Sequence, residues 1–294
     1  MILIADSGST KTDWRLLVPL NGSVSAFVFA TSGINPFFLA DDEIVALLKS
    51  ELCSQFETTT TPVSVSSVEQ IYFYGAGIAS KEKSDLISRS LQTVFRSADM
   101  IESHSDLLGA ARGLCGRKPG IPCILGTGSN SCFYDGESIA DNVPPCGFIL
   151  GDEGSGAVMG RKLLSAFLKR DLPESLCEKL RYECGLSKDI ILERVYRQAL
   201  PNRFLAQHAQ FLDTYKNEKA IQSIIIECFE EFFDRNVLKY PKCREVPIHF
   251  TGSIAFHFAE FLRHVAASRR LTIGKITKSP IDDIASYHTN TVKN

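Results

Sequence analysis

Three short segments rich in glycine and hydroxyl residues follow apolar runs, an arrangement suited to holding phosphate groups. They are Asp6-Ser7-Gly8-Ser9-Thr10-Lys11-Thr12, Gly126-Thr127-Gly128-Ser129 and Thr251-Gly252-Ser253. Backbone N–H groups in such turns can face phosphate oxygens, and glycine lets backbone and ligand approach closely. A β-hairpin for the first segment and an N-capped helix for the third are structural alternatives. The repetition favours phosphate binding, and it is not of the Walker A kind because that string is absent.

Carboxylates near these segments are candidates for proton transfer and for binding hydroxyl groups. Asp6 ends the first apolar run, Asp106 begins a helical pattern, and Asp152 and Glu153 lie between glycines. A carboxylate within hydrogen-bond reach of a hydroxyl can accept its proton. An acidic residue in the first turn of a helix is also stabilised by the helix dipole, so a structural role stays open for Asp106, Asp152 and Glu153.

Charge and composition narrow the classes of partner. The chain has 294 residues, a formal net charge of −2 and no long basic run, which predicts neither a nucleic-acid nor a membrane partner. With no signal peptide and no long apolar segment, the sequence predicts a cytoplasmic protein. The nine cysteines include no C-x-x-C pair, which argues against a disulfide framework and a zinc site.

An alternation of strands and helices positions the candidate residues and predicts an α/β protein. Strands are expected at 2–6, 13–18, 24–30, 70–74 and 100–103, and helices at 43–52, 81–96 and 106–115. A second strand–turn–strand unit at 122–134 resembles the first and indicates duplicated halves. Helices then follow at about 158–170, 174–183, 187–199, 203–214 and 218–238, before a strand at 246–250 and a helix at 254–267.

The length exceeds that of a typical single core, so two domains are expected. The glycine-flanked segment 116–120 marks the crossing between them. We expect an N-terminal domain over residues 1–117 and a C-terminal domain over 118–294, with a helical insert at about 158–238. The last helix, within 281–294, is free to pack back on the N-terminal domain.

In their order, these segments resemble the sugar kinase, heat-shock ATPase and actin superfamily. The chain is most similar to the BadF/BadG/BcrA/BcrD-type ATPase family, in its N-acetylglucosamine kinase-like branch. The resemblance spans nearly the whole chain and implies two ribonuclease-H-like, actin-like ATPase domains with ATP and Mg²⁺ in an interdomain cleft. It rests on Asp6–Thr12, Gly33–Pro36, Ser105-Asp106 with Ala110-Ala111, Gly126–Ser131, Gly151–Gly156 and Thr251–Ser253.

The resemblance also implies a role for individual residues. Asp106 becomes the base that takes the proton from the attacking sugar hydroxyl, and Asp6 orients Mg²⁺ through water. The ATP phosphates are assigned to Gly8, Ser9, Thr10, Lys11, Thr12, Gly126, Thr127 and Gly128. Adenosine is assigned to Thr251, Gly252 and Ser253. Sugar contacts are assigned to Asn35, Asp106, Ser129, Asn130, Asp152 and Glu153.

The implied activity is ATP-dependent phosphorylation of an amino sugar, with N-acetylglucosamine and its C6 hydroxyl as the first expectation. Alternatives are an activator ATPase that drives electron transfer from an iron–sulfur cluster, and a non-catalytic sugar-sensing regulator. The partners expected are the sugar and ATP, in a homodimer. The family pattern has an aromatic residue or a histidine soon after the Asn that corresponds to Asn35, whereas here Asn35 is followed by Pro36, Phe37 and Phe38. The two phenylalanines either stack on the sugar or belong to the core, and core is the default for such residues.

Overall fold

The computed structural model describes residues 1–8, 10–20, 23–58 and 63–291. Its contacts divide the chain into two compact units, which are described separately. Unit 1 comprises Met1–Arg117 and Pro280–Asn294, and unit 2 comprises Lys118–Ser279. Both combine a sheet with helices, so the predicted α/β class is confirmed.

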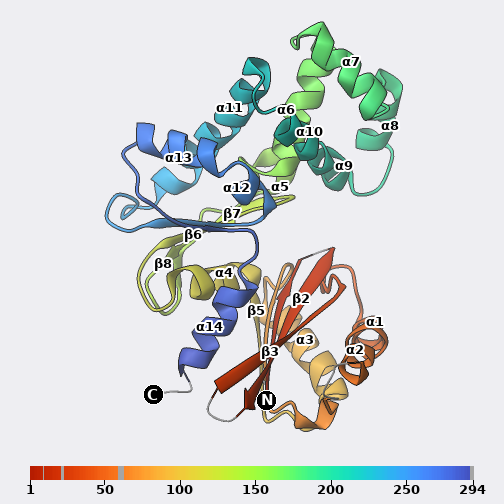
Figure 1. The fold of residues 1–294 in the computed structure, drawn as a ribbon, viewed down its shortest axis with the longest axis vertical. Coiled ribbons are helices and arrows are strands. Elements are labelled where there is room, and N and C mark those ends of the chain that lie inside the picture. Colours follow the sequence, from red (N-terminus) through yellow and green to blue (C-terminus); the bar gives the residue numbers. More distant parts are fainter. Residues whose placement is uncertain (9, 21–22, 59–62, 292–294) are drawn as a thin grey trace. The chain divides into compact units, whose positions relative to one another are not determined.

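Unit 1 is built on a five-stranded sheet with the order β3-β2-β1-β4-β5 (Figure 1). Its strands are β1 (Ile2–Ser7), β2 (Lys11–Leu20), β3 (Ser23–Ser32), β4 (Gln70–Gly75) and β5 (Met100–Ser105). The first three are antiparallel neighbours, whereas β1, β4 and β5 run parallel. The parallel strands therefore bring the ends of β1, β4 and β5 to one edge of the sheet.

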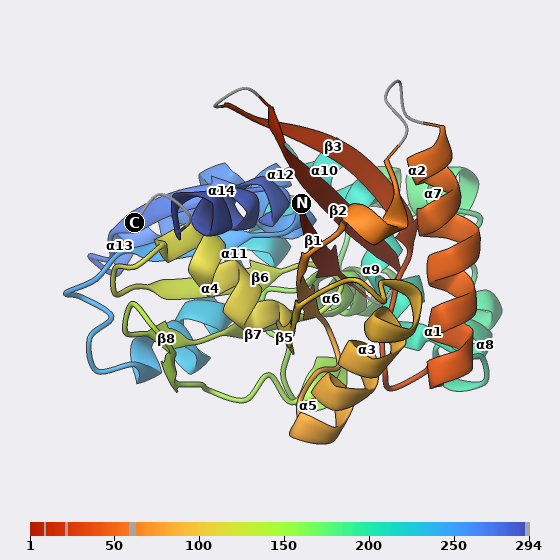
Figure 2. The same cartoon turned by 90° about the horizontal axis from the view of Figure 1, so that it is seen from below.

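Helices cover both faces of this sheet, because alternate residues of β1 are apolar on both sides. Leu3 and Ala5 pack in one core, and Ile4 packs with Ile281 and Ile284 in another. The first face carries α1 (Asp41–Leu47), the π-helical turn η1 (Leu48–Cys53), α2 (Ser54–Glu57) and α3 (Lys81–Val94). The other carries α4 (Asp106–Cys115) and α14 (Ile281–Thr291), which lie side by side in Figures 1 and 2. A short 3₁₀ turn, η2 (Val65–Ser67), precedes β4.

Unit 2 repeats the strand order of unit 1 in a four-stranded sheet, β11-β10-β6-β7. Its strands are β6 (Ile121–Leu125), β7 (Ser129–Ser131), β10 (Ile248–Thr251) and β11 (Ile273–Thr277). As with β1 and β2, β6 and β7 are antiparallel, and as with β1, β4 and β5, β6, β10 and β11 are parallel. The segments Asp6–Thr12 and Gly126–Ser129 therefore join equivalent strands of the two units.

The second strand of the unit expected at 122–134 is divided in the structure, which corrects the sequence prediction. The strand is interrupted at Cys132, after β7. It resumes as β8 (Phe133–Tyr134), which pairs with β9 (Ile139–Asp141) in a separate two-stranded sheet. Pro122 of β6 lies opposite the break and accepts a hydrogen bond from Cys132 N. Because proline has no N–H to return, the regular ladder ends there.

The helices of unit 2 pack mainly around one large apolar core. The helix expected at 203–214 is divided at His208, and the helix expected at 254–267 is divided at Phe258. At His208 the backbone N–H bonds to Leu205 O, a tighter 3₁₀-type bond. No helix among the described residues is long and apolar enough to cross a membrane. The helices are α5 (Gly147–Leu150), α6 (Gly156–Lys169), α7 (Glu174–Glu183), α8 (Lys188–Tyr196), α9 (Pro201–Gln207), α10 (Ala209–Thr214), α11 (Lys219–Arg235), the 3₁₀ turn η3 (Val237–Lys239), α12 (Ser253–His257) and α13 (Ala259–Ser268).

An aromatic and cationic cluster holds α14 in unit 1. The ring of His288 stacks on Tyr72 with centroids 3.6 Å apart, and its Nε2 lies 2.9 Å from the hydroxyl of Tyr74. Arg112 donates to that hydroxyl at 2.8 Å. Burial, together with the positive charge of Arg112, lowers the pKa of His288 to about 3. The folded protein therefore holds this imidazole neutral.

We expect His288 to make unit 1 sensitive to acid. The unfolded chain binds a proton at this side chain below its ordinary pKa of about 6.5, whereas the folded chain does not until about pH 3. The contribution of His288 to the free energy of unfolding is complete above about pH 6.5, and it is lost progressively as the pH falls towards about 3. In His288→Gln, the slope of unfolding free energy against pH should decrease by up to about 1.4 kcal/mol per pH unit.

Urea unfolding at a series of pH values between about 6.5 and 4 measures this slope. His264→Gln is the matched control, because His264 is exposed on α13. An unchanged slope in His288→Gln would contradict the assignment.

Candidate active site

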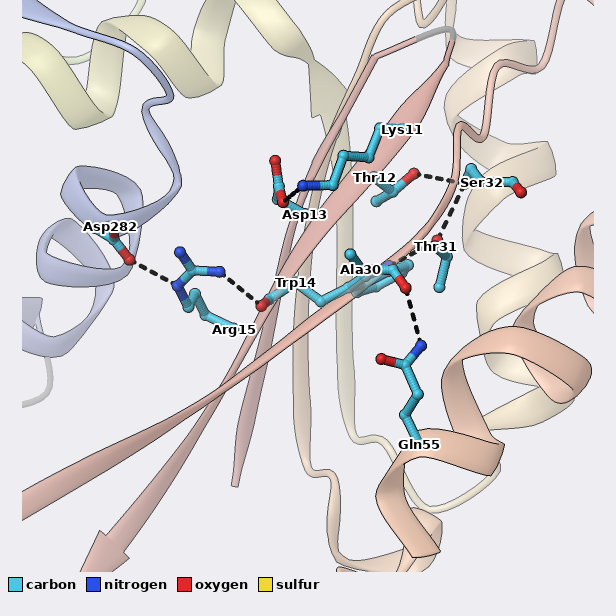
Figure 3. Close-up of polar contacts among 10 residues, drawn as sticks. All are labelled: Lys11, Thr12, Asp13, Trp14, Arg15, Ala30, Thr31, Ser32, Gln55 and Asp282. Atoms are coloured by element: carbon cyan, nitrogen blue, oxygen red, sulfur yellow. Dashed lines mark hydrogen bonds and ion pairs between the residues drawn. The ribbon is translucent and has the colours of Figure 1, made fainter. Parts of the chain in front are cut away.

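The first phosphate-binding candidate is braced by two buried hydroxyls. Ser7 Oγ and Thr12 Oγ1 lie 2.7 Å apart, and Ile34 N donates to Ser7 Oγ at 3.0 Å. Thr12 Oγ1 also donates to Ser32 O at 3.1 Å, as Figure 3 shows. The side chain of Thr12 therefore supports the β1–β2 connection from inside.

The exposed residues of this segment are Gly8, Thr10 and Lys11. Gly8 N donates to Lys11 O at 2.9 Å, and Lys11 Nζ lies 2.6 Å from a carboxylate oxygen of Asp13 (Figure 3). The prediction for Ser9 lies outside the described residues. Lys11 is thus a solvent-accessible cation at the start of β2, and an anionic ligand would compete with its carboxylate partner.

A group of carboxylates surrounds the end of β1. Burial, together with the negative charges of Asp106 and Asp13, raises the pKa of Asp6 to about 7. Asp106 begins α4, where Ser105 Oγ caps the helix by accepting from Leu108 N. Burial also raises the pKa of Asp106, although the hydrogen bond from Leu107 N, 2.8 Å long, opposes this. A carboxylate with a raised pKa is better suited to accept a proton.

Asn35 lies buried after β3, against a glycine that the sequence reasoning did not single out. Its Oδ1 accepts from Phe37 N at 2.9 Å. Gly77 has φ +83°, and a Cβ there would lie 2.2 Å from Asn35 Oδ1. Only glycine leaves room for this carboxamide, and the signal available was the Gly75-Ala76-Gly77 string after β4.

Phe37 and Phe38 are 66% and 69% exposed, so the prediction that they belong to the core is wrong. The backbone turns at this point, with Phe38 N and Leu39 N both donating to Asn35 O. This turn directs Leu39 onto the core instead. Lys83 Nζ lies over the Phe37 ring at 5.5 Å from its centroid, which is one contact the exposed ring makes.

In unit 2, the N-terminus of α6 holds the second candidate turn. Gly156 N donates to Gly126 O at 2.9 Å, and Ala157 N donates to Thr127 O at 3.1 Å. Within the turn, Gly126 N donates to Gly128 O. The amides of Thr127 and Gly128 have no backbone acceptor within the described part of the chain. These two N–H groups are therefore available to an anion.

Asp152 lies against the second turn, whereas Glu153 points to α11. Asp152 Oδ1 accepts from Ser129 N at 3.4 Å, and burial raises the pKa of Asp152 to about 6. Both oxygens of the buried Glu153 are engaged, one by Arg235 at 2.8 Å and the other by Asn236 at 3.2 Å. The two adjacent carboxylates thus have different environments, and Asp152 is the one beside the turn.

The other predicted sugar contacts in unit 2 lie on β7. Ser129 is buried, and Asn130 is half-buried. Asn130 Oδ1 accepts from Ser131 N at 2.9 Å and from Asn142 Nδ2 at 3.1 Å. These bonds fix the orientation of the carboxamide.

The third segment forms one wall of a pocket of about 440 Å³ within unit 2. Gly252 has φ +113°, and a Cβ there would lie 2.2 Å from Leu125 O, so β6 and β10 approach closely only with glycine. Thr251 is buried, and Ser253 begins α12. Of the three predicted adenosine residues, Ser253 therefore lines the pocket, and the other two support its wall. The lining residues are Gly126, Thr127, Gly156, Ala206, Gln207, Ala209, Gln210, Asp213, Ser253, Ile254, His257 and Phe258.

Sequence reasoning did not identify the contribution of α9 and α10 to this pocket. Gln207, Gln210 and Asp213 recur at intervals of three and form a polar stripe, which was the signal available in the sequence. The pocket thus combines the second turn, the third segment and this stripe.

No family model matches the sequence, and no curated protein matches it. Among solved structures, the putative N-acetylglucosamine kinase from Porphyromonas gingivalis is 45% identical, with a TM-score of 0.92. The match covers 99% of this chain and 100% of that one. The chain belongs to the N-acetylglucosamine kinase-like family. The resemblance predicted from the sequence is thereby confirmed.

More distant structures share only the fold of this family. The putative N-acetylglucosamine kinase from Chromobacterium violaceum is 16% identical, covers 97% of this chain and 98% of its own, and has a TM-score of 0.70. The ROK hexokinase from Thermus thermophilus is 12% identical, covers 99% of both chains and has a TM-score of 0.57. These likenesses agree with the predicted actin-like ATPase fold.

We expect Gly252→Ala to destabilise unit 2. An alanine must adopt a strained positive φ and also displace the Leu125 carbonyl, which together should cost about 2–4 kcal/mol. Gly185→Ala is the matched control, because Gly185 has φ +63° and nothing within 4 Å of the added Cβ. It should cost only the backbone strain, about 1 kcal/mol. Equal urea midpoints for the two variants would contradict the close approach of β6 and β10 as the cause.

Proposed function

We propose that this protein transfers the γ-phosphate of ATP to an amino sugar, and that N-acetylglucosamine, at its C6 hydroxyl, is the acceptor. The full-length 45% identity to a putative N-acetylglucosamine kinase supports the substrate class. The observation that carries the proposal is the pocket of unit 2, which is lined by Gly126 and Thr127 of the second turn and is large enough for a nucleoside.

Unit 2 supplies groups for the phosphate donor. The free amides of Thr127 and Gly128 suit a phosphate, and Ser253 and the neighbouring lining residues suit the adenosine. Phosphoryl transfer depends mainly on positioning and charge stabilisation, so preformed amides of this kind contribute directly. In unit 1, we assign the exposed Gly8, Thr10 and Lys11 to the phosphates, with Thr12 as their support. The assignment of Ser9 to the phosphates stays a prediction from the sequence.

Unit 1 supplies the base. Leu107 N–H donates to one carboxylate oxygen of Asp106 and fixes the orientation of the carboxylate. Burial raises the pKa of Asp106, which makes it a better proton acceptor. Asp106 takes the proton of the sugar hydroxyl as the hydroxyl oxygen attacks the γ-phosphorus, and the bond from that phosphorus to the β,γ-bridging oxygen breaks to release ADP. The remaining sugar contacts are assigned to Asn35, Ser129, Asn130 and Asp152, and Glu153 supports the loop that carries Asp152.

The carboxylates at the end of β1 fit a magnesium ion held through water. Asp6 has a pKa of about 7 because its negative neighbours and burial disfavour its charge, and a cation would relieve both. No group of three or more acidic, cysteine or histidine side chains able to enclose a metal occurs among the described residues. Mg²⁺ commonly keeps several of its waters, so Asp6 would hold the ion indirectly. When bound, the ion supplies charge neutralisation at the phosphates.

A coupled ADP-release assay over a panel of amino sugars tests the proposal. We expect sugar-stimulated turnover by the wild type and a loss of about 10²–10⁴-fold in kcat for Asp106→Asn, because the amide cannot accept the proton. The KM for ATP should change little.

Asp85→Asn is the control, because Asp85 is an exposed carboxylate on α3. Absence of sugar-stimulated ADP release by the wild type would sink the proposal. Sugar binding without turnover would favour a regulator, and visible absorbance from an iron–sulfur cluster would favour an activator ATPase.

We expect Asp152 to make sugar binding dependent on pH. Its pKa of about 6 is raised, so the carboxylate is ionised above that value and becomes protonated as the pH falls below it. Protonation weakens its hydrogen bonds to sugar hydroxyls. The KM for the sugar should therefore rise up to about tenfold per pH unit below pH 6.

Asp152→Asn should show a high sugar KM with no such acid limb, measured at saturating ATP. A sugar KM in the wild type that stays constant between about pH 7.5 and 5 would argue against this role.

A further inference from the structure

We infer that Asp213 binds the ribose of the nucleotide, accepting hydrogen bonds from its 2′ and 3′ hydroxyls, so that the enzyme selects ribonucleotides over deoxyribonucleotides as phosphate donors. This inference rests on the proposed kinase function and names the residue that recognises the ribose of the phosphate donor. It concerns only the pocket of unit 2.

Asp213 lines the pocket from α10, whereas the phosphate turn lies near Ala206 on α9. Ala206 marks the part of the pocket nearest that turn. A Cβ added at Gly156 would lie 3.3 Å from Ala206 Cβ and also 3.3 Å from Gly126 O. Asp213 follows Ala206 by seven residues and lies on the next helix, α10, beyond the division at His208. His257 lies one turn beyond Ser253 on α12. A nucleoside that extends from the turn would meet these two residues after its phosphates.

Two basic side chains hold the Asp213 carboxylate in place. Lys216 Nζ lies 2.9 Å from Oδ1, and His257 Nδ1 lies 3.3 Å from Oδ2. Because His257 is on α12 and Asp213 is on α10, the second contact joins two helices that line the pocket. A carboxylate has about four lone-pair positions, so each oxygen can still accept from a ligand. The Asp213 side chain is 31% exposed, which leaves it accessible from the pocket.

The chemistry of the lining distinguishes the parts of a nucleotide. An ionised carboxylate only accepts hydrogen bonds, and phosphates have none to donate. A vicinal diol presents two neighbouring donors, which match the two oxygens of one carboxylate. An adenine edge presents a donor beside an acceptor, which matches an amide side chain such as Gln207 or Gln210 better. Asp213 therefore fits the ribose, and the glutamines fit the base.

The test compares kcat/KM for ATP, 2′-deoxy-ATP, 3′-deoxy-ATP and ITP, with a sugar that the wild type phosphorylates. We expect the wild type to prefer ATP over each deoxynucleotide by about tenfold or more, as a hydrogen bond to a charged group commonly contributes. This preference should fall to near unity in Asp213→Ala and to an intermediate value in Asp213→Asn. The preference for ATP over ITP should persist in both variants.

Asp234→Asn is the matched control, because Asp234 pairs with Arg269 at 2.7 Å and does not line the pocket. It should keep the wild-type preference for ribose. A wild-type preference near unity, or one that survives in Asp213→Ala, would overturn the inference. Loss of the preference for ATP over ITP, with the ribose preference intact, would overturn it too by assigning Asp213 to the base.

Calorimetric binding of ADP and 2′-deoxy-ADP separates this inference from the kinase proposal. A ribose preference in binding that depends on Asp213, without phosphorylation of any sugar, would uphold the inference and reject the kinase. Phosphorylation of a sugar without a ribose preference would uphold the kinase proposal and reject the inference about Asp213. If neither nucleotide binds, both are overturned.

Discussion

The contact between the N-terminus of α6 and the Gly126–Gly128 turn is the interaction on which the candidate site of unit 2 depends. Two N–H groups of the first helical turn donate to the carbonyls of Gly126 and Thr127. These bonds turn the carbonyls towards α6 and leave the amides of Thr127 and Gly128 without a backbone acceptor in the described part of the chain. The same contact places Gly156 and Asp152 beside the turn, and with them part of the lining of the pocket in unit 2.

The two units place a turn at the same point of the same strand order but stabilise it differently. In unit 1 the buried hydroxyls of Ser7 and Thr12 brace the connection between β1 and β2. In unit 2 the backbone of α6 braces it. The first arrangement is surrounded by the carboxylates Asp6, Asp13 and Asp106, which suits proton transfer and a cation. The second presents free amides, which suit an anion. A duplicated topology thus carries two different chemistries.

The helical part of unit 2 supports the site as well as enclosing a core. Glu153 is tied to Arg235 and Asn236 at the end of α11, which fixes the loop that carries Asp152. The stripe on α9 and α10 supplies polar groups to the pocket, and Asp213 links it to α12 through His257. These helices, for which the sequence suggested no role, therefore contribute to ligand binding in our proposal.

The sequence by itself determined the features that depend on near neighbours. Strand positions, the three glycine-rich segments and the place of Asp106 at a helix start follow from local pattern, and their order identified the family. Tertiary structure alone decided that Phe37 and Phe38 are exposed and that Glu153 is bonded to α11. It also decided that Asp213 lines the pocket and that Gly77 contacts Asn35. The reason is physical: each of these outcomes depends on which distant segment packs against the residue, and hydrophobic periodicity and turn chemistry carry no information about that choice.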